Sequence, residues 1–363
     1  MAGTLRGLYT GTGSFDIVGH RKRWYIASGL LVTICVLSIL LRGFNLGIDF
    51  EGGTSVQMSS QGAHGPISTQ QVEQVFGRTI GVPAESVQTV GAGAASSILI
   101  RANTLAPEQT FKLKAALFDQ LQPLGRNGQP SRQSISDSAV SASWGGEISQ
   151  KALVALLVFL VLVSIFLAVY FEPRMAGAAL VALLHDVLVT AGIYSLVGFE
   201  VTPASVIGLL TILGFSLYDT VVVFDKVQEN TRGLLGLTRR TYAEAANLAV
   251  NQTLMRSINT SLIAVLPVLG LLIVGFGLLG VGTLKDLALV QMVGILAGAM
   301  SSIFLATPLL VDLTMRKPAY QQQAQRVEAR RAKVAGRAVT AEGDGDGAAA
   351  AGAATRREGA MAP

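Results

Sequence analysis

The chain has 363 residues, of which 50% are hydrophobic and only 14% are charged, with a formal net charge of +5. This composition excludes an ordinary soluble enzyme and indicates an integral membrane protein, so we expect the lipid bilayer as its surroundings and no nucleic-acid partner. The single cysteine, Cys35, lies in an apolar run, so the sequence offers neither an internal disulfide nor a cysteine cluster for a metal.

Six segments are apolar and long enough to cross a bilayer as helices, which takes about 20 residues. They are residues 24–41, 152–171, 175–197, 203–224, 257–280 and 287–311. The first follows a basic cluster, as a secretory signal would. No small-residue cleavage site follows it, so we expect a retained anchor.

The positions of the Lys and Arg residues predict that both termini are cytoplasmic. Four basic residues precede the first helix, five lie in 226–256 and nine follow residue 311, whereas the connection 198–202 has none. The expected cytoplasmic parts are therefore residues 1–23, a segment at 226–256 that contains a surface amphipathic helix, and a tail at 312–363. The low complexity of residues 340–363 predicts that this tail is largely disordered.

Residues 42–150 then form a domain outside the cytoplasm, between the first and second helices, whereas residues 151–311 hold helices two to six. The pattern of residues 42–150 reads strand 54–58, helix 69–79, strand 86–90, strand 97–101, helix 107–122 and strand 134–143. Ser68 and Gln71 make a capping box, and Phe111, Ala115 and Phe118 recur on one helical face that would cover a sheet. This βαββαβ order predicts a small α+β, ferredoxin-like domain.

Asp219 is the one carboxylate in the apolar run 203–224 and the first candidate for chemistry. A charged side chain at the bilayer centre costs at least about 2.5–3.5 kcal/mol, so such residues usually face a bundle interior and serve ion or proton passage. Removal from water favours the neutral acid, so Asp219 would hold a proton when sealed and release it when wetted. The alternative is an Asp that is hydrogen-bonded to its neighbours and serves packing only.

Arg256 lies at the start of the predicted fifth helix, at a depth comparable with Asp219, and is the expected counter-charge. Arginine keeps its proton, so its approach would favour an ionised Asp219 and its withdrawal would let the acid become protonated. The alternative is an anchor that reaches the lipid headgroups. Thr260, one turn along the same face, either bridges to the pair or bonds back to its own helix.

His185 and Asp186 lie near the middle of the third predicted helix, where they either extend a polar path from Asp219 or form a structural pair. They are weak metal ligands, because the predicted helices offer only Cys35 as a further His, Cys or Glu, and we expect no metal. Gly294 and Gly298 have the spacing that permits close helix approach. The chain has no Walker loop, nucleophile elbow or zinc motif, so we expect neither an enzyme nor a bound cofactor.

Four blocks resemble one known family. They are LGIDFEGGTSV (46–56), HDV (185–187), GLLTILGFSLYDTVVVFDKVQEN (208–230) and NQTLMRSINTS (251–261). In order and spacing they look like SecF, the membrane subunit of the bacterial SecD/SecF protein-export complex, over roughly residues 15–317. Tyr218 is a departure, since the family often has Asn directly before the Asp that matches Asp219.

This resemblance implies a six-helix half that pairs with SecD into a twelve-helix unit of the resistance-nodulation-division superfamily, in the bacterial cytoplasmic membrane. It further implies association with the SecYEG channel and the use of the proton gradient to pull preproteins across after the motor SecA has started them. The family's proton-path residues match Asp219, Arg256 and Thr260. Two other functions remain open, namely half of a proton-coupled exporter of small hydrophobic molecules and a non-transporting scaffold of the translocon.

Overall fold

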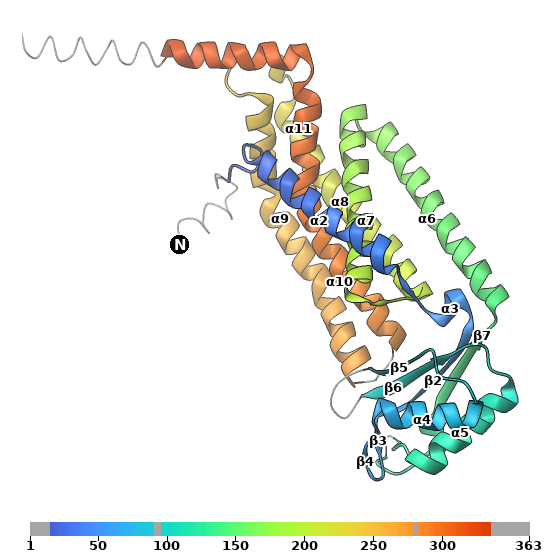
Figure 1. Ribbon diagram of the computed structural model, residues 1–363. Helices are drawn as coiled ribbons and strands as arrows, with labels where there is room; N and C mark the ends of the chain where they lie inside the picture. The colour runs from blue at the N-terminus through green and yellow to red at the C-terminus, as the bar shows by residue number, and fades with distance from the viewer. Residues whose placement is uncertain (1–14, 91–95, 126, 279–281, 335–363) are drawn as a thin grey trace, which may run out of the picture.

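The computed structural model describes residues 15–90, 96–125, 127–278 and 282–334. Six helices in these ranges are long and apolar enough to cross a membrane, as predicted. They form a bundle at one end of the molecule, and an α+β unit forms the other end (Figure 1). The described helices of the bundle are α2 (Arg21–Arg42), α6 (Ala142–Tyr170), α7 (Pro173–Val197), α8 (Pro203–Thr231), α9 (Tyr242–Gly270), α10 (Gly282–Ser301) and α11 (Thr307–Met315).

Two π-helical segments interrupt the regular helices. Leu271–Leu278 continues α9, and Ser302–Ala306 joins α10 to α11 in one helical path. A π-helical turn carries an extra residue, which changes the direction in which neighbouring side chains point. The second segment begins at the buried Ser302, directly after the buried Ser301.

Several helix boundaries differ from the prediction. The fifth helix begins at Tyr242 rather than at residue 257, because Thr241 and Glu244 form a capping box there and no Gly or Pro lies between residues 242 and 257. The predicted surface helix before residue 257 is therefore part of the spanning helix, and α8 continues to Thr231. The second helix begins ten residues early, because Ser141 caps it by accepting a hydrogen bond from the backbone N–H of Trp144 at 3.3 Å.

The α+β unit has the predicted βαββαβ order. Its elements are β2 (Gly53–Ser59), α4 (Thr69–Ile80), β5 (Ser86–Val90), β6 (Ser97–Ala102), α5 (Pro107–Leu121) and β7 (Ser136–Val140). The four strands pair in the order β5-β6-β2-β7, all antiparallel, which is the ferredoxin-like sheet. A short two-stranded ribbon, β3 (Gln61–Gly62) with β4 (Gly65–Pro66), precedes α4.

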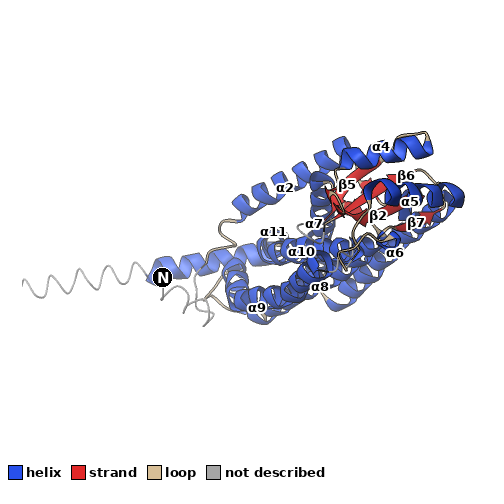
Figure 2. Ribbon diagram, turned by 90° about the horizontal axis from the view of Figure 1, so that it is seen from below, coloured by secondary structure: helices blue, strands red, loops and turns tan. Residues whose placement is uncertain are grey.

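The two helices of this unit cover one face of the sheet, on the side away from the bundle (Figures 1 and 2). The predicted capping box at Ser68 is present. The predicted covering face of α5 is wrong in part, because Phe111 is 73% exposed whereas Leu113 and Leu117 are fully buried. Alternate residues of β2 and β6 meet these leucines, so Val56 and Ile100 complete the core.

The opposite face of the sheet is tied to the bundle by a short joint. Directly after α2, β1 (Asn45–Leu46) pairs in parallel with β8 (Glu200–Val201), which lies between α7 and α8. Arg101 of β6 forms a buried ion pair with Glu200 and donates to the Asn45 side-chain oxygen at 3.2 Å. The joint thereby connects β6 of the sheet to the segment between α7 and α8.

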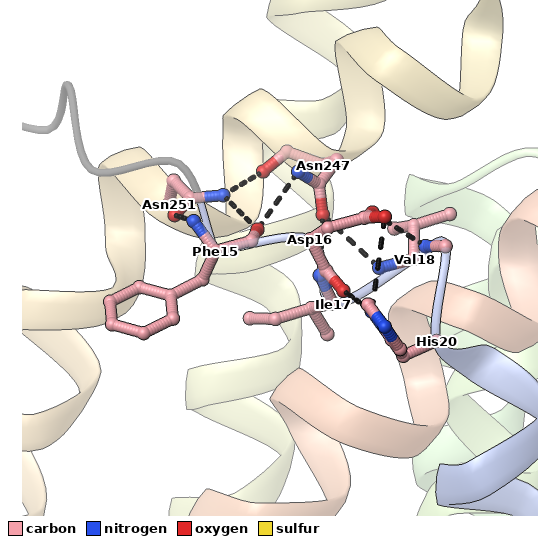
Figure 3. A network of polar contacts seen from close by, with 8 residues as sticks. Phe15, Asp16, Ile17, Val18, His20, Asn247 and Asn251 are labelled. Carbon is pink, nitrogen blue, oxygen red and sulfur yellow. Dashed lines mark hydrogen bonds and ion pairs between the residues drawn. The ribbon is translucent and has the colours of Figure 1, made fainter.

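The opposite end of the bundle is fastened by the segment that precedes α2 (Figure 3). The Asn247 amide of α9 donates to the Phe15 carbonyl at 3.0 Å and accepts from the Ile17 and Val18 N–H groups at 3.0 and 3.1 Å. Asn251 adds a second donor to the Phe15 carbonyl at 2.9 Å. The segment before α2 is therefore hydrogen-bonded to α9 at two side chains.

Residues 318–334 form a further helix across the same end of the bundle (Figure 1). It lies in the part of the chain predicted as a largely disordered tail. Buried Gln323 fixes it by donating to the carbonyls of Leu237 and Arg240, at 3.0 and 2.8 Å. The low-complexity stretch 340–363 lies outside the described residues.

Candidate functional site

Asp219 lies on the inner face of α8 and is 4% exposed. Two serine hydroxyls donate to its carboxylate, Ser257 of α9 at 2.6 Å to one oxygen and Ser302 of the π-helical turn to the other. Hydrogen bonds to a charged group are worth about 1.5–3 kcal/mol each, so two of them offset the cost of a carboxylate in the bilayer interior. The acid is thus held between three helical segments.

Asp186 of α7 forms a second buried carboxylate and is 1% exposed. Ser216 of α8 and Ser301 of α10 donate to the same oxygen, at 2.5 and 2.8 Å. The other oxygen lies 3.1 Å from Nδ1 of His185, whose buried Nε2 has no hydrogen-bond partner among the described residues. Ser216 and Asp219 are one turn apart on α8, so the two acids share one polar layer.

The close packing of α8 against α10 supports this layer. A methyl group on Gly298 would lie 2.8 Å from the Ser216 Cβ, and one on Gly294 would collide with Ile212. A side chain at either position would require its neighbour to shift, so the close helix approach that the glycine spacing permits is present here.

Arg256 does not pair with Asp219 in this structure, which corrects the predicted ion pair. Its guanidinium donates to the Tyr218 hydroxyl at 3.1 Å, and both side chains are exposed on the outer face of the bundle. The cause is helix geometry, because consecutive residues point about 100° apart. Tyr218 and Arg256 thus form an outer layer, whereas their neighbours Asp219 and Ser257 form the inner one.

Thr260 donates to the Arg256 carbonyl at 2.7 Å. Of the two alternatives predicted for Thr260, the structure shows the hydrogen bond to its own helix. The side chain does not reach Asp219. Of the five residues predicted for a proton path, the structure brings His185 and Asp186 into contact and leaves Arg256 and Thr260 outside the inner layer.

Four serines of the site escape prediction from sequence, namely Ser216, Ser257, Ser301 and Ser302. Serine is common in membrane helices and carries no charge, so each alone gives no signal. The adjacent pair at 301–302, in the otherwise apolar stretch 292–306, is the clue that the sequence offers. No group of three or more His, Cys, Asp or Glu side chains that could hold a metal occurs among the residues that the structure describes.

Fold and site together define a polytopic membrane protein that buries the carboxylates of Asp186 and Asp219 in one polar layer of its helical bundle and carries a ferredoxin-like unit between its first two spanning helices. Residues 120–316 match the family described as "Protein export membrane protein SecD/SecF, C-terminal". Residues 37–63, which include β1, α3 (Ile48–Glu51) and β2, match the "SecD/SecF GG Motif". The chain belongs to the SecD/SecF family.

Named relatives agree with this assignment. The chain is 58% identical to "Protein translocase subunit SecF" of Mycobacterium tuberculosis, over 90% of this chain and 73% of the relative. It is 31% identical to "Protein translocase subunit SecDF" of Thermus thermophilus, over 85% of this chain and 40% of that protein. The crystal structure of the Thermus SecDF, described as a translocon-associated membrane protein, superposes with a TM-score of 0.70 at 30% identity, covering 83% of this chain and 38% of that one.

Proposed function

We propose that the chain is an auxiliary subunit of the Sec preprotein translocase that, with SecD, uses the proton gradient to promote late, ATP-independent export. The SecF and SecDF names of its relatives support a role in protein translocation, and the fused SecDF supports SecD as the partner. The observation that carries the proton-driven part is Asp219, an acid buried in a membrane bundle and held by donors from two other helical segments.

The proposed orientation places the α+β unit outside the bacterial cytoplasmic membrane and both termini inside, following the basic residues. In this arrangement the SecYEG channel and its motor SecA are further partners, and translocating preproteins are the cargo. The outer layer of Tyr218 and Arg256 is then available to a second six-helix half.

Protonation of Asp219 is the proposed driving event. A neutral acid holds the serine hydroxyls less strongly than a carboxylate does, which frees α9 and the π-helical turn to move. A turn of α9 by about 100° would replace the Ser257 hydroxyl with the guanidinium of Arg256, its neighbour in the chain, and would carry Thr260 inward with it. The same residues thus provide a state with Arg256 outside and a state with Arg256 beside an ionised Asp219.

The Asp186–His185 pair extends the proposed proton path along the polar layer. Moving one elementary charge through 100 mV provides about 2.3 kcal/mol, so a few protons in each cycle are enough to displace a domain that holds a polypeptide weakly. The joint at Arg101 and Glu200 would pass the displacement from α7 and α8 to the α+β unit.

The test is gradient-driven completion of export in membrane vesicles, after the ATP-driven step has been stopped. We expect Asp219→Asn to assemble with its partner and to lose this completion. Asp225→Asn removes an exposed carboxylate from the same helix and is the matched control, which we expect to behave as wild type. Normal gradient-dependent completion by Asp219→Asn contradicts the proposal.

Two other functions give different results. A scaffold of the translocon needs no titrating acid, so proton flux would be equal with and without the Asp219 carboxylate. An exporter of small hydrophobic molecules would conduct protons through Asp219, but photo-crosslinkers on the α+β unit would not capture an exported polypeptide. Two features of the described residues argue against that exporter: they hold one small α+β unit, and they hold no second large insertion between the later helices.

A further inference from the structure

Ser301 and Ser302 are consecutive residues that serve two different acids. Ser301 ends α10 and donates to Asp186 of α7, whereas Ser302 begins the π-helical turn and donates to Asp219 of α8. Both serines are buried, with 2% and 0% exposure. Two consecutive residues of one helical path therefore contact the two carboxylates.

Each of these hydroxyls also lies within hydrogen-bond distance of a second acceptor. Ser301 Oγ is 3.2 Å from the Gly298 carbonyl, and Ser302 Oγ is 3.1 Å from the Ala299 carbonyl. A hydroxyl has one proton to donate and can also accept. Each serine can thus donate to an ionised carboxylate, or accept from a protonated one while its own proton turns to the carbonyl of its own helix.

This choice of acceptor keeps both protonation states of the acids hydrogen-bonded without large movement of heavy atoms. That matters in the bilayer interior, where an unsatisfied buried polar group costs about 1–3 kcal/mol. It also changes what α10 is attached to. With ionised acids the hydroxyls tie α10 to α7 and α8 as donors, and with neutral acids these ties become the weaker bonds between uncharged groups.

We propose that Ser301 and Ser302 are positioning residues that join Asp186 and Asp219 into one two-carboxylate proton site, and that α10 responds to the charge of that site. The inference rests on the proposed proton-driven function. The titratable group in contact with either acid in the described structure is His185 of α7, at Asp186. The cation of α9, Arg256, is turned to Tyr218, and Ser216 and Ser257 complete the contacts from α8 and α9.

The test follows the infrared carbonyl-stretch bands of the protonated acids in the full chain, reconstituted with its SecD partner. Asp186→Asn and Asp219→Asn assign the two bands, since each removes one. We expect Ser302→Ala to shift the Asp219 band and Ser301→Ala to shift the Asp186 band, because each band reports the hydroxyl bound to that acid. Ser302→Thr and Ser301→Thr keep the hydroxyl and should leave the bands near their wild-type positions.

Coupling is tested by the pH dependence of the same bands. When both serines are intact, we expect Asp186→Asn to change the pH profile of the Asp219 band. When Ser301→Ala and Ser302→Ala are also present, we expect Asp186→Asn to leave that profile unchanged. Bands that do not move in either alanine variant, or a response to Asp186→Asn that persists without the hydroxyls, overturn the inference.

The failures of the two proposals can be told apart. If Asp219→Asn retains gradient-driven export, the proposed function fails. If Asp219→Asn blocks export but the alanine variants at 301 and 302 export at wild-type rate with unshifted bands, only the serine bridge fails. We expect Ser302→Ala to slow gradient-driven export about tenfold, the effect of losing roughly one hydrogen bond to a charged group, and Ser302→Thr to restore it.

Discussion

The joint between the α+β unit and the bundle gives a quantitative prediction. Arg101 and Glu200 form an ion pair in which the side chains are only 9% and 18% exposed. Removal of one charge leaves the other buried without its partner, which costs about 3 kcal/mol, whereas removal of both is close to neutral. We therefore expect Arg101→Met and Glu200→Gln each to loosen the joint and the double variant to recover most of the loss.

Hydrogen exchange at Gly47 measures this loss directly. Its N–H donates to the Val201 carbonyl at 2.8 Å, beside the β1–β8 pairing. If local opening of the joint limits exchange, 3 kcal/mol corresponds to about a hundredfold faster exchange in each single variant.

The matched control is Arg132→Met, which breaks the ion pair of Arg132 with Asp119 at 3.4 Å. Both of those side chains are more than 60% exposed, so this pair contributes little and exchange at Gly47 should stay unchanged. Unchanged exchange at Gly47 in both single variants at Arg101 and Glu200 refutes the reasoning.

Three further predictions concern packing. Leu117→Ala should destabilise the α+β unit by about 2–5 kcal/mol in hydrogen-exchange measurements, whereas Phe111→Ala should change its stability by less than about 0.5 kcal/mol because Phe111 is mostly exposed. Gly298→Leu should reduce the yield of monodisperse protein in size-exclusion chromatography, since α8 lies against that position; Gly214→Leu, which meets nothing within 4 Å, should not. Asn247→Ala should speed amide exchange in the segment before α2, which loses three hydrogen bonds; equal exchange rates would show that the segment is held otherwise.

Much of the fold follows from local signals in the sequence. The bilayer thickness sets the length of an apolar segment that can cross it, so the sequence predicts the number of spanning helices. Strands β5 and β6 and helix α4 were bounded by turn residues and by the Ser68 cap, and their order predicts the ferredoxin-like sheet. The start of the fifth helix was missed because hydropathy marks where a helix enters the bilayer rather than where it begins, and the cap at Thr241 lies well before that point.

The site was less predictable. Asp219, Asp186 and His185 stand out because charged groups are rare in apolar runs. Their partners are serines contributed by helices far apart in the chain, and only tertiary packing decides which serine meets which acid. The same limit applies to Arg256. Arg256 and Ser257 are neighbours on α9, so the rotation of this helix about its own axis decides which of the two side chains faces Asp219.

We propose above all that Asp219 takes up and releases the protons that drive export. Proton flux into vesicles that contain the chain and its SecD partner, followed with an entrapped pH-sensitive dye under an imposed gradient, tests this claim most directly. We predict that Asp219→Asn abolishes the flux and that Asp225→Asn conducts as wild type does. Equal flux through the wild type and Asp219→Asn would contradict the account.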